Sequence, residues 1–364
     1  MTSRSPCRRG LAVLALAALA LAGCTSSPGP QAGSSDGEGV VGIALPSSDD
    51  LAGERLGEAL GDEMRSRGYR VDLQYAADAE RTQASQVQNM VTKGEDAIVL
   101  VPVSQAVLDP ARAVTDDAGV SLVVAGRDVD GTGAVEAVDA AALGRAQARA
   151  LLDAMDRPSL GEPTPVAIVT GVADDPDDAA RYAAASEVLD QAVTSGTLRI
   201  VAGTDLDGAA VADSAEDVEA AAEERVRALL GSVDEEAPRA VLALGDAVSR
   251  GVVAALTTPD PEATASPSPS AEEDPDPVTR APLAVITTGG DASTVRALRD
   301  GVVTATVFLD TRTWAGPLAD AVVEALAGDA PTPSVAPTAT TVERAAVESV
   351  FLESDWLRPE DLEG

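Results

Sequence analysis

Residues 71–101 show the hydrophobic pattern of a strand, a helix and a second strand in succession. Val71, Leu73 and Tyr75 alternate with polar residues, which is typical of a strand with one buried face. The next run is mostly polar, and its apolar positions recur three and four apart, as in an amphipathic helix: Ala84, Val87, Met90 and Val91. Residues 97–101 are apolar throughout, which indicates a strand buried on both faces of a parallel sheet. The pattern therefore predicts a right-handed βαβ unit.

The same alternation of strands and helices continues along the chain and predicts two doubly wound α/β domains. In the first, strands are expected at residues 40–45, 71–75, 97–101, 120–125 and 134–138, and helices at 51–67, around 84–91 and at 104–117. In the second, strands are expected at 166–169, 198–202 and 240–244, and helices at 140–156, 177–194, 213–230 and 247–256. A chain of 364 residues is long enough for both domains.

Two internal stretches interrupt this pattern. Residues 257–281 have frequent Pro, many acids and almost no apolar side chains, so they cannot bury enough surface to offset their ordering entropy. We expect them to form a disordered surface insertion. Residues 24–39 are rich in Ser, Gly and Pro and are expected to form a flexible tether.

Residues 1–23 are predicted to be a lipoprotein signal peptide. Three arginines precede an apolar run at residues 11–22 that is too short to span a bilayer comfortably. The run ends in Leu-Ala-Gly-Cys, which resembles a bacterial lipobox and implies lipid attachment to Cys24 and an extracytoplasmic, membrane-anchored protein. Export by the general route or by the twin-Arg route remains open. Cys24 would be the only cysteine after cleavage, so no intrachain disulfide is expected.

Composition excludes several classes of function. The formal net charge is −34, and a surface that acidic repels phosphate backbones, so nucleic-acid binding is not expected. The chain has no His, which removes the commonest general base and metal ligand. No nucleophile–base pair is visible either, so we expect neither an enzyme nor a bound metal or cofactor.

The predicted βαβ unit also carries a resemblance to a known family. The sequence DLQYA, followed by Q-x-SQ-x-x-NMVTKG and an apolar strand, resembles type I periplasmic sugar-binding proteins of ABC importers, in the xylose, ribose and multiple-sugar branch. The resemblance implies two lobes joined by three hinge crossings, near residues 138–139, 287–291 and 308–312. Lobe I would then comprise residues 40–138 and 290–308, and lobe II residues 139–289 and 309–364.

Ligand contacts are expected in the loops beyond the carboxyl ends of the strands, which would lie on either side of one cleft. Asp and Arg side chains suit a sugar because they hold neighbouring hydroxyls by paired hydrogen bonds. Position and resemblance together give these candidates: Ser48, Asp49, Arg127, Asp128, Asp177, Arg181, Asp246 and Asp291. Asp at a helix start is also an ordinary N-cap. The cap interpretation is favoured for residues 174–178 and is equally open for Asp246, whereas ligand contact is favoured for Arg181 and Asp291.

Aromatic side chains, which usually cover the apolar face of a sugar, make up only 2% of the chain. Only Tyr182 and the hinge residue Phe308 are expected near the cleft, and Leu309 replaces a Lys of the related hinge motif. The leading hypothesis is a lipid-anchored extracytoplasmic solute-binding protein that captures a sugar-like ligand for an ABC permease. The alternative is a degenerate homologue that acts as a sensor or interaction protein without transport.

Overall fold

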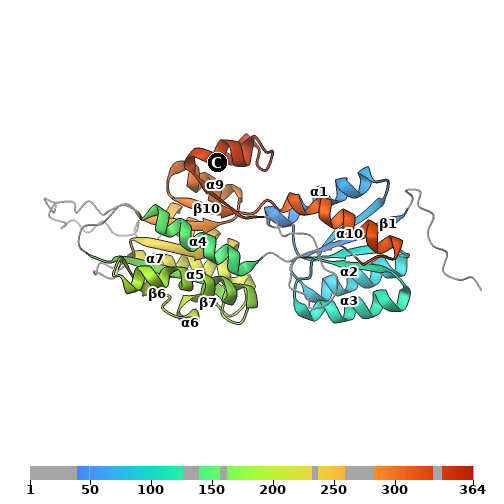
Figure 1. Ribbon diagram of the computed structural model, residues 1–364, viewed down its shortest axis with the longest axis horizontal. Helices are drawn as coiled ribbons and strands as arrows, with labels where there is room; N and C mark the ends of the chain where they lie inside the picture. The colour runs from blue at the N-terminus through green and yellow to red at the C-terminus, as the bar shows by residue number, and fades with distance from the viewer. Residues whose placement is uncertain are drawn as a thin grey trace, which may run out of the picture. The chain divides into compact units, whose positions relative to one another are not determined.

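The computed structural model describes residues 39–48, 50–125, 139–155, 162–231, 237–258, 283–330 and 338–363, and these residues form two separate sheets. The first sheet has four parallel strands in the order β2-β1-β3-β4. Figure 1 shows it with helices on both faces. They are β1 (Val40–Leu45), β2 (Arg70–Tyr75), β3 (Ala97–Leu100) and β4 (Ser121–Val124). The helices between them are α1 (Leu51–Ser66), α2 (Glu80–Lys93) and α3 (Gln105–Ala118). The predicted βαβ unit is confirmed, with helix α2 longer than its apolar positions suggested.

The second sheet has the strand order β11-β10-β9-β8-β5-β6. The short strand β7 also pairs with β5. Its strands are β5 (Thr164–Val172), β6 (Leu198–Ala202), β7 (Ala210–Ala212), β8 (Ala240–Leu244), β9 (Ala284–Thr288), β10 (Ala305–Phe308) and β11 (Thr340–Glu343). The accompanying helices are α4 (Ala140–Ala154), α5 (Pro176–Thr194), α6 (Leu206–Ala209), α7 (Val218–Gly231), α8 (Asp246–Thr257) and α9 (Ala292–Asp300). Among the described residues, the strand pairs of this sheet are parallel except β10 with β11.

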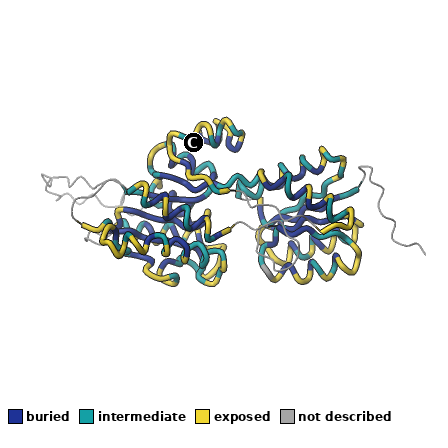
Figure 2. The backbone as a smooth tube through the Cα atoms, viewed as in Figure 1, coloured by how far each residue is buried: buried dark blue, intermediate teal, exposed yellow. Residues whose placement is uncertain are grey.

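Burial accounts for this layering. Figure 2 shows the strands of both sheets largely buried, with half-buried and exposed helical faces outside them. Val41, Ile43 and Leu45 of β1 are fully buried on one side of the first sheet, and Ala44 is buried on the other. A strand that buries both faces matches the unbroken apolar runs of the sequence. The sheets are therefore central layers whose carboxyl ends remain free to form a site.

The division between the two sheets differs from the one expected. Residues 290–307 were assigned to lobe I, but α9 and β10 belong to the second sheet, where Val295 and Leu298 pack in its core. The segment that returns to the first sheet is α10 (Ala315–Ala327), which packs against β3 and β4 and buries Leu318 and Val322 in the core of that sheet. The expectation was wrong because buried parallel strands look alike in sequence, whichever sheet they join.

Several predicted segments lie outside the described residues. They are the signal peptide and nearly all of the tether, the strand at 134–138 with its hinge crossing, most of the insertion at 257–281, and the candidates Asp49, Arg127 and Asp128. Within the part of the chain that the structure describes, no helix is long and apolar enough to cross a membrane.

Candidate functional site

A cavity of about 230 Å³ lies where several strands of the two sheets end. It is bounded by the first turn of α1 after β1, by α4 and α5, by the start of α8, by the loop after β9, and by residues after β10. Its polar and aromatic lining residues are Asp50, Asp177, Arg181, Asp246, Arg250, Thr288, Asp291, Phe308, Thr311 and Trp356. The volume is below the roughly 300–1,000 Å³ of sites for drug-sized ligands, so the cavity suits a small molecule. Four of the eight predicted ligand residues line it: Asp177, Arg181, Asp246 and Asp291.

Asp246 is the first residue of α8 and projects into this cavity from the end of β8. Its side chain is accessible from the cavity, yet protein surrounds it closely enough for loss of hydration to raise the pKa of its carboxyl. Arg181 and Arg250 oppose that shift, whereas the charges of Asp50 and Asp291 add to it. Among the described residues, none forms a hydrogen bond or ion pair with this carboxylate. Asp246 therefore keeps its hydrogen-bonding capacity for a ligand.

Arg181 is held in place by a neighbour on the same helix. Its Nη1 donates to Asp178 Oδ1 at 2.8 Å, and Asp178 Oδ2 accepts from the Val172 backbone N–H at 2.9 Å. Burial raises the pKa of Asp178, while the bond from Val172 and the charge of Arg181 oppose that rise. The remaining guanidinium nitrogens of Arg181 donate to no other described residue. One end of the guanidinium is thus fixed and the other can donate to a ligand in the cavity.

Asp291 lines the cavity but is fully engaged as the N-cap of α9. Its Oδ1 accepts from the backbone N–H groups of Ser293 and Thr294, both at 3.0 Å, and its Oδ2 accepts from Thr294 Oγ1 at 2.7 Å. The Ser293 hydroxyl also donates to Oδ1. Ligand contact was the favoured interpretation of this residue, but these bonds give it the structural role of a cap.

We therefore predict that Asp291→Ala lowers the free energy of unfolding by about 0.5–2 kcal/mol, the usual cost of removing an Asp N-cap. Asp291→Asn should recover most of this loss, because Asn caps about as well as Asp. Urea unfolding of the two variants and the parent measures the difference. Equal stability of Asp291→Ala and the parent would contradict the capping role.

The other predicted residues divide between the cavity and the surface. Asp177 lines the cavity from the first turn of α5, where its backbone N–H donates to the N-cap Asp175 at 2.9 Å. That bond confirms the capping interpretation for Asp175. Ser48 is exposed and is not among the lining residues. The same loop instead contributes Asp50, the N-cap of α1, whose Oδ1 accepts from the Gly53 N–H at 2.6 Å.

The aromatic part of the site also differs from the prediction. Tyr182 is absent from the lining, and its hydroxyl donates to the Gly203 carbonyl at 3.1 Å. Phe308 does line the cavity, together with Trp356 from the C-terminal segment, which sequence reasoning missed. The two rings meet edge to face with centroids 4.8 Å apart and an interplanar angle of 73°. The site therefore has a larger apolar wall than expected.

The described lining residues carry more negative than positive charge. Four aspartates (Asp50, Asp177, Asp246, Asp291) line the cavity with two arginines, Arg181 and Arg250. Both arginines already have acidic partners: Arg181 pairs with Asp178, and Arg250 Nε donates to Glu219 Oε2 at 2.8 Å. An anionic ligand would meet the net negative charge of these described lining residues. The cavity is thus better suited to a neutral polar molecule than to an anion.

Comparison with known proteins assigns the family. The periplasmic binding protein domain family matches residues 41–330, so the chain belongs to that family. The multiple sugar-binding periplasmic receptor ChvE of Rhizobium radiobacter is 29% identical over 169 residues, which are 46% of this chain and 48% of the receptor. The multiple sugar-binding periplasmic protein SbpA of Azospirillum brasilense is 26% identical over 45% of this chain and 47% of its own length. This chain thus aligns with about half the length of these curated relatives.

Solved structures show the same fold across nearly the whole length of the proteins compared. An ABC transporter solute-binding protein from Clostridium phytofermentans with bound β-D-glucose superposes with a TM-score of 0.70 at 22% identity, over 89% of this chain and 99% of its own. A carbohydrate transporter solute-binding protein from Chloroflexus aurantiacus in complex with D-glucose has a TM-score of 0.67 at 19% identity, over 89% and 98% of the two chains. The α/β fold of type I periplasmic binding proteins is therefore confirmed.

Proposed function

We propose that this member of the periplasmic binding protein family captures a small neutral polyol or monosaccharide for an ABC importer. The main support is that the Asp246 carboxylate and the Arg181 guanidinium line the same small cavity. The carboxylate has no hydrogen-bond partner among the described residues, and the guanidinium is bonded to Asp178 through Nη1 alone. A carboxylate accepts hydrogen bonds from hydroxyls and a guanidinium donates them, so together they recognise a polyhydroxylated ligand. The sugar-binding relatives and the sugar-bound neighbours support the same ligand class.

Ligand capture would stabilise one arrangement of the two lobes. Lining residues come from the loop after β1 of the first sheet and from four strand ends of the second, so a ligand that touches both sets stabilises one arrangement of the lobes. An ABC permease would recognise that arrangement. The ligand itself undergoes no chemical change in this scheme.

A thermal-shift screen tests this function. D-glucose, L-arabinose, myo-inositol, allitol and glycerol are the neutral probes, and D-glucuronate is the matched anion. A probe present at a hundred times its dissociation constant should stabilise the folded protein by about 2.7 kcal/mol, which is a shift of several degrees. We expect at least one neutral probe to shift the melting temperature and glucuronate to have no effect.

A second candidate is a degenerate receptor that acts as a sensor or interaction protein. The favouring observation is that Phe308 and Trp356 are only 4% and 1% exposed, so neither offers an open ring face for sugar stacking. If no probe in the screen shifts the melting temperature, this candidate replaces the first.

We further propose that the protein is anchored to the outer face of the cell membrane by a lipid on Cys24. The support is the Leu-Ala-Gly-Cys sequence at the end of a short apolar run. Cys24→Ser should release the protein from the membrane fraction or leave the signal peptide uncleaved. Detergent phase partitioning measures this, and unchanged partitioning of the variant would count against the anchor.

A further inference from the structure

Trp356 connects the C-terminal segment to the wall of the cavity. Its ring is 1% exposed, and its Nε1–H donates to the Gly290 carbonyl at 2.7 Å. Gly290 lies so close that a Cβ there would be 2.7 Å from the Phe308 ring and 2.8 Å from Trp356 Nε1. The loop after β9, Phe308 and Trp356 are thus packed as one unit on this side of the cavity.

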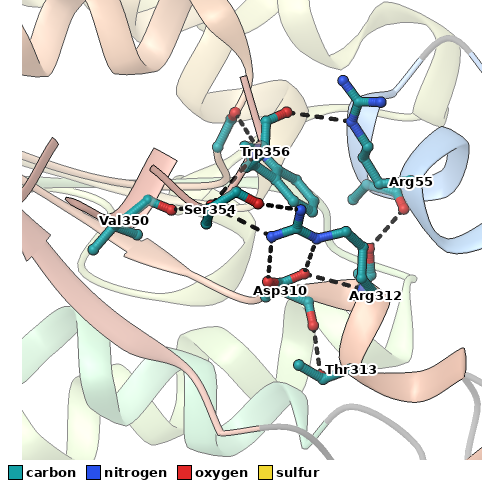
Figure 3. Close-up of polar contacts among 10 residues, drawn as sticks. Arg55, Asp310, Arg312, Thr313, Val350, Ser354 and Trp356 are labelled. Atoms are coloured by element: carbon teal, nitrogen blue, oxygen red, sulfur yellow. Dashed lines mark hydrogen bonds and ion pairs between the residues drawn. The ribbon is translucent and has the colours of Figure 1, made fainter. Parts of the chain in front are cut away.

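Arg312 fixes the indole from another side. Its guanidinium carbon lies 5.2 Å from the ring centroid of Trp356, within the range of a cation–π contact. Asp310 holds this guanidinium with two bonds, of 2.9 Å to Nε and 2.7 Å to Nη2, and Nη1 donates to the Ser354 carbonyl at 2.7 Å (Figure 3). This arrangement leaves the indole little freedom to move independently of residues 308–312.

The backbone of Trp356 makes the remaining connection. Its carbonyl accepts from Arg55 Nε of helix α1 at 3.2 Å (Figure 3). The first residues of α1, Leu51 and Ala52, line the cavity, and Thr311 Oγ1 donates to the Ala52 carbonyl at 2.7 Å. Trp356 therefore contacts the cavity wall of the second sheet through its ring, and helix α1 of the first sheet through its backbone carbonyl.

We propose that Trp356 is a positioning residue of the binding site: through Gly290 and Phe308 it sets one wall of the cavity, and through Arg55 it couples that wall to helix α1. This inference rests on the proposed function for its effect on affinity. The coupling itself is a property of the unliganded protein. Ligand affinity then depends on Arg55 and on the Trp356 indole, although neither Arg55 nor the indole N–H would need to touch the ligand.

Helix α1 offers a matched control for Arg55. Arg55 pairs with Glu58 at 2.8 Å and Arg65 pairs with Asp62 at 2.8 Å, so each arginine has an acidic partner three residues away. Of these two arginines, Arg55 alone also donates a hydrogen bond to the described C-terminal segment, at the Trp356 carbonyl. We expect Arg55→Ala and Trp356→Phe each to weaken D-glucose binding roughly tenfold, as loss of one buried hydrogen bond does, while Arg65→Ala binds as the parent does.

A double-mutant cycle separates positioning from general destabilisation. If Arg55 and the indole act through the same unit, the double variant should lose less affinity than the product of the two single losses. A merely structural role would lower the melting temperatures and leave affinity unchanged. Arg55→Ala with the affinity of Arg65→Ala would overturn the proposal.

Acrylamide quenching of tryptophan fluorescence gives a readout that needs no ligand. In a Trp314→Phe background, where Trp356 is the remaining tryptophan, Arg55→Ala should raise the quenching constant of the unliganded protein, because Trp356 loses a contact, whereas Arg65→Ala should not. Equal quenching in the two variants overturns the coupling. If the parent fails to bind any probe but the quenching difference persists, the proposed function fails and the coupling stands.

Discussion

Asp246→Asn is expected to weaken polyol binding by about ten- to a hundredfold while making the unliganded protein more stable at neutral pH. A hydrogen bond to a charged group contributes roughly 1.5–3 kcal/mol, and loss of the charge removes most of it. The stability gain is small, because the Asp246 side chain is exposed to the cavity. It follows from partial loss of hydration and from the charges of Asp50 and Asp291, which raise the pKa of Asp246 despite the opposing arginines. A carboxylate that is unfavourable in the folded state and unengaged with described residues has the properties of a binding group.

The sign of the pH dependence distinguishes this explanation from a change in packing. A carboxyl whose pKa is raised by folding binds more protons in the folded state, so its ionisation destabilises the fold above that pKa and has no effect below the unfolded value. The stability difference between Asp246→Asn and the parent should therefore be largest near pH 7 and disappear under acidic conditions. Isothermal titration with D-glucose and urea unfolding at several pH values measure both effects.

Asp116→Asn serves as the control, because Asp116 is an exposed residue of α3 that does not line the cavity. This variant should match the parent in both experiments. Asp246→Asn with unchanged affinity, or with lower stability at pH 7, would contradict a ligand-binding role.

Local patterns predicted the elements well, and the pairing of elements less well. The alternation in residues 71–75 and the apolar run at 97–101 correspond to β2 and β3. Both were predictable because the burial of one or both faces of a strand determines which neighbouring positions are apolar. Membership of a sheet depends on contacts between distant segments. Helix α10 packs against β4 more than 190 positions earlier in the chain, and no local pattern encodes that choice.

The candidate site shows the same limit. The position of Asp246 and Arg181 in the cavity wall was predictable, because they lie at or near a helix start that follows a strand end, where open α/β sheets bind ligands. Asp291 has the same sequence context, but Ser293 and Thr294 engage both of its oxygens. Trp356 was not predictable, because it reaches Gly290 across 66 positions from a segment without a repeating pattern. Polar residues at strand ends are therefore readable from sequence, whereas the choice between cap and free side chain at Asp291, and the packing of distant segments, are not.

Glu95 is a buried acidic residue that does not line the candidate binding cavity. It is 3% exposed, and neither of its carboxylate oxygens accepts a hydrogen bond from a described donor. A Cβ at Gly42 would collide with Glu95 Oε2, which shows how tightly the carboxyl is enclosed beneath β1. Burial, with the adjacent carboxyl of Asp72, raises the pKa of Glu95 to about 7, against the opposing charge of Lys93. Burial also opposes ionisation of Asp72, yet bonds from Lys93 and Gln74 lower its pKa. The proton of the pair therefore resides on Glu95.

We predict that Glu95→Gln stabilises the protein at pH 8 by on the order of 2–3 kcal/mol and has little effect at pH 4. The folded state retains the Glu95 proton up to about pH 7, whereas the unfolded chain loses it near the ordinary pKa of Glu. Parent stability from this group therefore falls as the pH rises between those two values and is constant above them. The magnitude stays moderate because Glu95 lies beside Lys93, whose side chain is 56% exposed, so water is close.

Urea unfolding between pH 4 and pH 8 measures the difference, and Glu187→Gln, at an exposed position of α5, is the control. A Glu95→Gln variant that follows the parent at every pH would show that the buried carboxyl ionises freely, and the proton assigned to the Glu95–Asp72 pair would then be wrong.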